Sequence, residues 1–288
     1  MPYLYLIGAV LTNASSSVIG TYFNRRNDGK KGTSSFYNFL QLCSVFACWL
    51  ILFAFDFSWD WGVLPYALLF ALFFTVCKVS IINALRHGPA TLTSLFIGLS
   101  LLITTGWGFL FWNAKWTLFV GIGLVLVVVS VFLCLYNGKK DEKKVSWKWL
   151  LFVVLAMVCN AGCSITQRTQ QMQYDGQHGN MLMAVATLFG TVACFVMWLR
   201  SDKTDAKTML KDSWYFPVGE GVFNVVLNIC VMRMALSPLS PSLIYPVIGV
   251  GGLMIVTLFS LFGFKEKLKW QQWLGIALGA VATALLSL

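Results

Sequence analysis

The chain has 288 residues, of which 58% are apolar and 11% charged, and its formal net charge is +10. So few charged residues exclude an ordinary soluble domain, and a mean hydropathy of +0.75 indicates an integral membrane protein. We therefore interpret the positive charge as a guide to membrane topology and not as a sign of nucleic-acid binding. The eight cysteines lie in apolar stretches without a CxxC pattern, which predicts buried thiols and no metal site.

Apolar stretches of about 20 residues, the length that crosses a bilayer core, recur along the whole chain. In chain order they predict ten membrane-spanning helices, at residues 2–23, 34–55, 62–85, 90–112, 117–136, 147–167, 180–199, 213–236, 241–263 and 270–288. The first stretch lacks a basic segment before it, so we interpret it as a retained helix and not as a cleaved signal peptide. The predicted fold class is an all-α membrane protein.

One ten-residue segment occurs in two versions. KWTLFVGIGL at 115–124 begins the fifth predicted helix, and KWQQWLGIAL at 269–278 begins the tenth. Asn13 and Asn160 also occupy matching positions, in the first and sixth helices. The unit of repetition is therefore five helices, and an odd number of crossings makes the second copy enter the membrane from the opposite face.

These matches predict two inverted-topology repeats. The first five-helix repeat covers 1–138, a basic cytoplasmic linker covers 139–146, and the second repeat covers 147–288. Two similar halves related by an axis in the membrane plane can expose one central site to each side in turn. The architecture thus favours a transporter that works by alternating access.

The second half also resembles a known family. The run SPLSPSLIYPVIGVGGLMIVTLFSLFGFKEKLKWQQWLGIALGAVATALL has a proline in the ninth helix (Pro246), a glutamate in the next turn (Glu266) and a Gly-rich tenth helix. It is similar to the closing segment of the drug/metabolite transporter superfamily, in particular its ten-helix EamA-like branch. The resemblance implies a membrane transporter. The first half lacks both the proline and the glutamate. When the two repeated segments are aligned, Trp112 takes the position of Glu266, and the fourth helix has no proline.

The lysines and arginines of the loops indicate the orientation of the chain. Lys115 falls on one side of the membrane, and we assign Arg168 to a loop on that side, as a solvated residue. The other side carries Arg25, Arg26, Lys30, Lys31, Arg86, Lys139, Lys140, Lys143, Lys144, Lys148, Arg200, Lys203, Lys207, Lys211, Lys265, Lys267 and Lys269. The basic side is expected to be cytoplasmic. We therefore predict a multi-pass protein of the plasma (bacterial inner) membrane with both termini extracytoplasmic.

Two charged residues fall inside predicted spans, where charge is costly and usually functional. Lys78 and Glu220 both lie about 11–12 Å from the cytoplasmic end of their helices, so we expect them to meet. Glu220, Asn224 and Asn228 are spaced four residues apart, which places them on one helix face. Either this stripe lines a transport cavity, or Lys78, Glu220 and the amides hold helices together; both can be true.

Further candidates come from the middle of the membrane. Asn13 and Asn160 either bind substrate between the repeats or join neighbouring helices. Tyr245 precedes Pro246, whose ring frees a backbone carbonyl one turn earlier. Gly275 and Gly279 predict close helix packing.

The sequence contains no GxSxG, HExxH or phosphate-loop pattern, so we predict neither an enzyme nor a cofactor. The favoured function is secondary transport of a small polar or amphipathic metabolite, or of a drug-like solute. Glu220 is the candidate group for a coupling proton or ion, although a tight pair with Lys78 would favour exchange or facilitated diffusion. The alternative is a membrane-embedded scaffold, which would lack a cavity that solutes can enter. The expected partners are a small-molecule substrate and the lipid bilayer.

Overall fold

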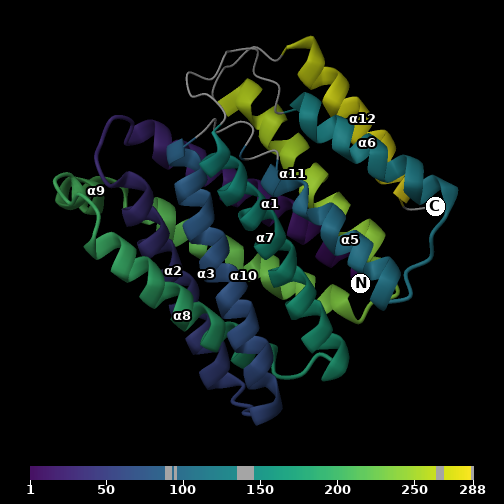
Figure 1. Ribbon diagram of the computed structural model, residues 1–288, viewed down its shortest axis with the longest axis horizontal. Coiled ribbons are helices and arrows are strands. Elements are labelled where there is room, and N and C mark those ends of the chain that lie inside the picture. The colour runs from purple at the N-terminus through teal and green to yellow at the C-terminus, as the bar shows by residue number, and fades with distance from the viewer. Residues whose placement is uncertain (88–92, 94–95, 135–145, 264–268, 287–288) are drawn as a thin grey trace.

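The computed structural model describes residues 1–87, 93, 96–134, 146–263 and 269–286, and within these ranges the chain is a bundle of α-helices without β-strands (Figure 1). Apart from Ser146, the predicted linker 139–146 lies outside the described residues, as does Glu266.

The first half contributes long apolar helices separated by short connections. Pro2 at the start of the first helix suits a position whose N–H has no helical partner. Asp60 begins the short 3-10 helix η1 by accepting a hydrogen bond from the Gly62 N–H at 2.7 Å. The helices are α1 (Pro2–Arg26), α2 (Thr33–Phe55), η1 (Trp61–Val63), α3 (Leu64–His87), α5 (Ser100–Phe111) and α6 (Leu118–Cys134).

The second half begins at Ser146, whose hydroxyl caps the next helix by accepting from the Trp149 N–H at 3.1 Å. That helix runs to Gln173, beyond the end predicted at 167, and a short helix that was not predicted precedes the eighth span. The helices are α7 (Trp147–Gln173), α8 (Gly179–Leu199), α9 (Ala206–Ser213), α10 (Tyr215–Ala235), α11 (Pro241–Gly263) and α12 (Trp270–Leu286).

Ten of these segments coincide with the apolar stretches of the sequence. Seven are long and apolar enough to cross a membrane, and three are shorter apolar helices at Phe96–Phe111, Leu118–Cys134 and Trp270–Leu286. The described residues thus support a multi-pass membrane protein, while the two-repeat arrangement stays a prediction. The chain begins and ends on the same side of the bundle, away from α9 (Figure 1).

The helices pack in pairs that each combine one element from either half. α1 lies along α10 and α3 along α7, while α2 packs on α8 and α6 on α12. One apolar core joins α1, α5, α6, α11 and α12, with Ile244 and Val250 near its centre. A second joins α2, α3 and α8 around Trp49 and Met181. Polar side chains between these two cores are therefore shielded from the bundle surface.

The pair α6 and α12 is held by small residues, as predicted for Gly275 and Gly279. A Cβ at Gly275 would lie 2.8 Å from the backbone nitrogen of Cys134, and one at Gly279 would lie 2.7 Å from the Ser130 hydroxyl. The close approach lets Ser130 donate a hydrogen bond to the Gly275 carbonyl at 2.7 Å. Small residues thus allow backbone contact between spans, and the packing prediction is confirmed.

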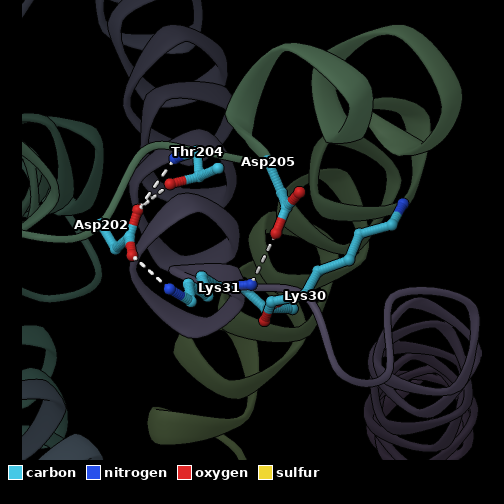
Figure 2. A network of polar contacts seen from close by, with 6 residues as sticks. Lys30, Lys31, Asp202, Thr204 and Asp205 are labelled. Carbon is cyan, nitrogen blue, oxygen red and sulfur yellow. Dashed lines mark hydrogen bonds and ion pairs between the residues drawn. The ribbon is translucent and has the colours of Figure 1, made fainter.

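The α1–α2 and α8–α9 connections meet in a network of polar contacts (Figure 2). The Lys31 ammonium lies 3.5 Å from the Asp202 carboxylate, and the Lys31 backbone N–H donates to Asp205 at 2.9 Å. Hydrogen bonds from Thr204, together with the nearby Lys31 charge, hold the pKa of Asp202 below its usual range. Met209 of α9 is fully buried. Apolar contact therefore also holds α9, the short helix that the sequence did not predict, against the bundle.

Gly32 is expected to be required at this junction. Its φ is +70° and a Cβ would overlap the Asp202 carbonyl oxygen, whereas Gly29, with φ +76°, has nothing within 4 Å of its Cβ position. Gly29→Ala should therefore cost only backbone strain, about 1–2 kcal/mol. Gly32→Ala should cost about 1–3 kcal/mol more because the two connections must separate. Thermal unfolding in detergent, followed by tryptophan fluorescence, measures both; equal losses would show that the Asp202 contact contributes nothing.

Candidate functional site

A cavity of about 690 Å³ lies between helices of the two halves. Its wall combines side chains of α1, α3, α5 and α6 with side chains of α7, α8, α10 and α11. Among the described residues that line it, none is Asp, Glu, Lys or Arg. The cavity is therefore uncharged and amphipathic, with a volume in the range of small-molecule sites.

Five of the residues singled out in the sequence line this cavity: Asn13, Asn160, Asn224, Asn228 and Tyr245. They come from α1, α7, α10 and α11, so the fold collects them from both halves. Their amides and hydroxyl are the polar groups that would orient a bound solute. Lys78 and Glu220 are not part of the lining.

The two matching asparagines each bind a neighbouring helix of the opposite half. The Asn13 amide donates to the Ile248 carbonyl of α11 at 3.1 Å, and the Asn160 amide donates to the Ser100 hydroxyl of α5 at 2.7 Å. Gly252 leaves the space that the Asn13 amide occupies, since a Cβ there would overlap it. Each asparagine thus joins helices and lines the cavity, so both roles considered from the sequence remain open.

An amide chain links α7 to α10 along the cavity wall. The Gln167 amide donates to the Asn228 side-chain oxygen at 3.0 Å, and the Asn228 amide donates to the Asn224 carbonyl at 2.8 Å and to its side-chain oxygen at 3.1 Å. Amides in a span must find partners because lipid offers none. Of the predicted stripe on α10, Asn228 therefore has a partner on α7 and Asn224 accepts from Asn228.

Glu220 lies apart from the cavity lining, among polar side chains where α1, α2 and α10 meet. One carboxylate oxygen accepts a hydrogen bond from the Gln41 amide at 2.9 Å, and the other is buried without a partner. The Tyr37 hydroxyl is also buried and unpartnered. Both groups lie close to the Cβ position of Gly20, at 3.4 Å for the hydroxyl and 3.6 Å for the carboxylate. This group of side chains thus holds an acid beside an unpaired donor.

The expected pairing of Lys78 with Glu220 is not formed. Among the described residues no ion pair joins them, and the Lys78 ammonium lies over the Phe74 ring at 5.6 Å from its centroid. A common depth in the membrane does not say in which direction around the helix axis each side chain points. Lys78 belongs to α3, which packs on α7 and α8, whereas the Glu220 carboxylate faces α1 and α2.

Arg168 was assigned to a solvated outer loop, and this assignment is wrong. The residue lies within α7 and is only 5% exposed. Its guanidinium lies over the Trp112 ring at 5.2 Å from the centroid and next to the Tyr245 hydroxyl. The loop prediction failed because α7 continues past Gln167 when the following polar residues are buried by neighbouring helices.

Sequence reasoning missed polar residues on the α7 wall of the cavity. Ser164 and Gln167 line it together with Asn160. These positions follow one another at intervals of four and three residues, the spacing of a single helix face. This signal is present in the sequence, because all three positions lie within the predicted span 147–167. Gln41, the partner of Glu220, stood alone in an apolar span without such a pattern.

Among the described residues, no group of three or more His, Cys, Asp or Glu side chains could hold a metal ion. The cysteines are free thiols. The polar groups of the site are instead amides and hydroxyls that can orient a solute by hydrogen bonds.

The comparisons with known proteins agree with this architecture. The sequence model of the EamA-like transporter family matches residues 1–136 and 147–288. No curated protein matches the chain at significant similarity. A crystal structure described only as that of a protein aligns over 99% of this chain and 95% of its own, with a TM-score of 0.75 and 10% identity, which shows a shared fold alone. Because the family match covers nearly the whole of both halves, the chain belongs to the EamA-like transporter family.

Proposed function

We propose that the protein is a secondary transporter that moves a small polar or amphipathic metabolite, or a drug-like solute, through the central cavity by alternating access. The observation that carries this proposal is the cavity of about 690 Å³, whose wall is shared by both halves and whose described lining residues include amides and hydroxyls but no Asp, Glu, Lys or Arg. Such groups bind a solute without holding it too tightly to be released. A scaffold would have no need of a cavity with this lining, which argues against the alternative function.

The helix pairing supports two inverted repeats of five helices. In these repeats α1, α2, α3, α5 and α6 would correspond, in this order, to α7, α8, α10, α11 and α12. A two-fold axis that relates the repeats must then exchange the pair α1–α10 with the pair α7–α3. It must also map α2–α8 and α6–α12 onto themselves. All four pairs are in contact. The hydrogen bond from Asn13 to α11 also has its counterpart in the hydrogen bond from Asn160 to α5. Rocking of one half against the other would then open the cavity alternately.

The substrate-binding residues in this proposal are Asn13, Asn160, Asn224, Asn228 and Tyr245, because all five line the cavity. Glu220 is proposed as the group that binds a coupling proton or cation, since one of its oxygens is buried without a partner. Lys78 is not one of these five lining residues; its ammonium lies over the ring of Phe74, which does line the cavity.

The cavity proposal is tested by filling the space. Purified protein is screened for solutes that raise its unfolding temperature, because a ligand of the folded state stabilises it by mass action. The best solute is then followed into proteoliposomes. Ser164→Trp, in the cavity wall, should abolish uptake, while Val158→Trp, at a position of the same helix that is 45% exposed, should leave it intact. Both variants are first checked for monodispersity; full uptake by folded Ser164→Trp would place the pathway elsewhere.

The orientation follows from the basic loops, and we propose that the protein lies in the plasma membrane with both termini outside. A carboxy-terminal alkaline phosphatase fusion should be active and a green fluorescent protein fusion should be dark. Insertion of the same reporters between Lys203 and Thr204, in the α8–α9 connection, should give the reverse pattern. A fluorescent carboxy-terminal fusion would contradict the orientation.

Glu220→Gln should abolish accumulation of the transported solute driven by an imposed proton gradient, because the neutral amide cannot bind and release a proton. Exchange of labelled for unlabelled solute should continue, since the cavity wall is unchanged. The matched control is Asp212→Asn, which removes an exposed carboxylate in α9. Proteoliposome uptake with and without the gradient measures both; gradient-driven accumulation by Glu220→Gln at the wild-type rate would exclude Glu220 from coupling.

A further inference from the structure

Arg168 is a buried cation without an acidic partner. The residue is 5% exposed, and its Nε atom is buried with no hydrogen-bond partner. Among the described residues, no carboxylate forms an ion pair with it. Its neighbours are the Trp112 ring and the Tyr245 hydroxyl, both uncharged. The guanidinium therefore carries an uncompensated positive charge within the bundle.

This arrangement is costly unless something else compensates it. Removal of an ion from water carries a larger penalty than one cation–π contact and one hydroxyl can offset. Buried charges in membrane proteins usually pair with another charge or mark a substrate pathway. The described residues supply no anion at the guanidinium, so a bound anion is a way to neutralise it.

Arg168 lies next to residues that line the cavity. It follows Gln167 and lies one turn beyond Ser164 on α7, and both of these residues line the cavity. Tyr245, beside the guanidinium, also lines the cavity and donates a long hydrogen bond of 3.5 Å to the Ser164 carbonyl. None of the described lining residues is Asp, Glu, Lys or Arg, and Arg168 itself is not part of the lining. Its guanidinium is related to the cavity through the neighbouring Tyr245 hydroxyl.

A second unpaired donor lies on the neighbouring helix. The Thr105 hydroxyl of α5 is fully buried and has no hydrogen-bond partner. α5 packs against α7 and α11, and Thr105 lies about 10 Å along the helix axis from Trp112, the residue after the end of α5. Thr105 is thus a second polar group without a partner in this part of the bundle, but it is not a neighbour of Arg168.

We propose that Arg168, together with the Tyr245 hydroxyl, forms a subsite for an oxyanion, and that the transported solutes are small organic anions. The planar guanidinium can bind both oxygens of a carboxylate, or two of a phosphate. The rest of the solute would lie in the cavity against the amides and the rings of Phe70 and Phe74. This inference rests on the proposed function, because it assigns the substrate class of the same cavity.

The first experiment uses the purified wild-type protein and pairs of solutes that differ only in charge. The pairs are benzoate with benzamide, succinate with succinamide, and glutamate with glutamine, and phenyl phosphate represents phosphate esters. At least one acid should raise the unfolding temperature while its amide does not. Stabilisation by phenyl phosphate but by no carboxylate would assign the subsite to phosphate esters. If no anion stabilises the protein more than its neutral counterpart, the proposal is wrong.

The second experiment assigns the binding to Arg168. Arg168→Gln should weaken binding of the stabilising anion by at least about tenfold in isothermal titration. Arg168→Lys should weaken it less because the charge is kept. Arg233→Gln, which removes an exposed arginine in the last turn of α10, should leave the affinity unchanged. Equal affinity for wild type and Arg168→Gln would overturn the assignment, and so would equal losses in Arg168→Gln and Arg233→Gln.

These measurements separate the inference from the proposed function. Binding in detergent does not depend on transport, so an anion that binds through Arg168 without being taken up contradicts the transport proposal alone. Uptake of neutral or cationic solutes that Ser164→Trp blocks, without preference for anions, contradicts the anion subsite alone. If Arg168→Gln does not fold, Tyr245→Phe is used. It should weaken binding of the acid and not of its amide, and an unchanged acid affinity would remove Tyr245 from the subsite.

Discussion

Hydrocarbon offers no hydrogen bonds, so each polar side chain within a span must find its partner inside the protein or in an aqueous cavity. This constraint explains the position of the asparagines. Asn13 is satisfied by a carbonyl of α11 and Asn160 by a hydroxyl of α5. The same contacts hold the two halves together and place both amides at the cavity. Helix assembly and the proposed solute binding therefore involve the same residues.

The charged groups obey the constraint in a different way. Glu220 is held by Gln41 where α1, α2 and α10 meet, and Arg168 lies between Trp112 and Tyr245 next to α5 and α11. The acid and the base thus occupy separate sites, and neither neutralises the other. The proposed coupling role of Glu220 depends on this separation, because an ion pair with a lysine would hold the carboxylate in its ionised form. The unpaired Arg168 is correspondingly able to bind an external anion.

Close backbone packing is also found away from the cavity. Gly275 and Gly279 bring α12 into backbone contact with α6, and Gly32 brings the α1–α2 connection onto Asp202. These contacts use the absence of a Cβ and tolerate no larger side chain. At the cavity, by contrast, amides meet other amides and hydroxyls, which can exchange partners without a change of volume. Movement of one half against the other would affect the polar wall more readily than the glycine contacts.

The sequence by itself determined the membrane class, the positions of the apolar helices and five of the residues that line the cavity. It did so because hydrophobic length and the spacing of Asn224 and Asn228 on one helix face are local properties. Only the tertiary structure decided which charges meet. Lys78 and Glu220 share a depth but lie on helices that face different neighbours, and depth along a helix says nothing about rotation around its axis. The burial of Arg168 and the Gln41 partner of Glu220 likewise depend on helices distant in sequence, whose packing no local pattern encodes.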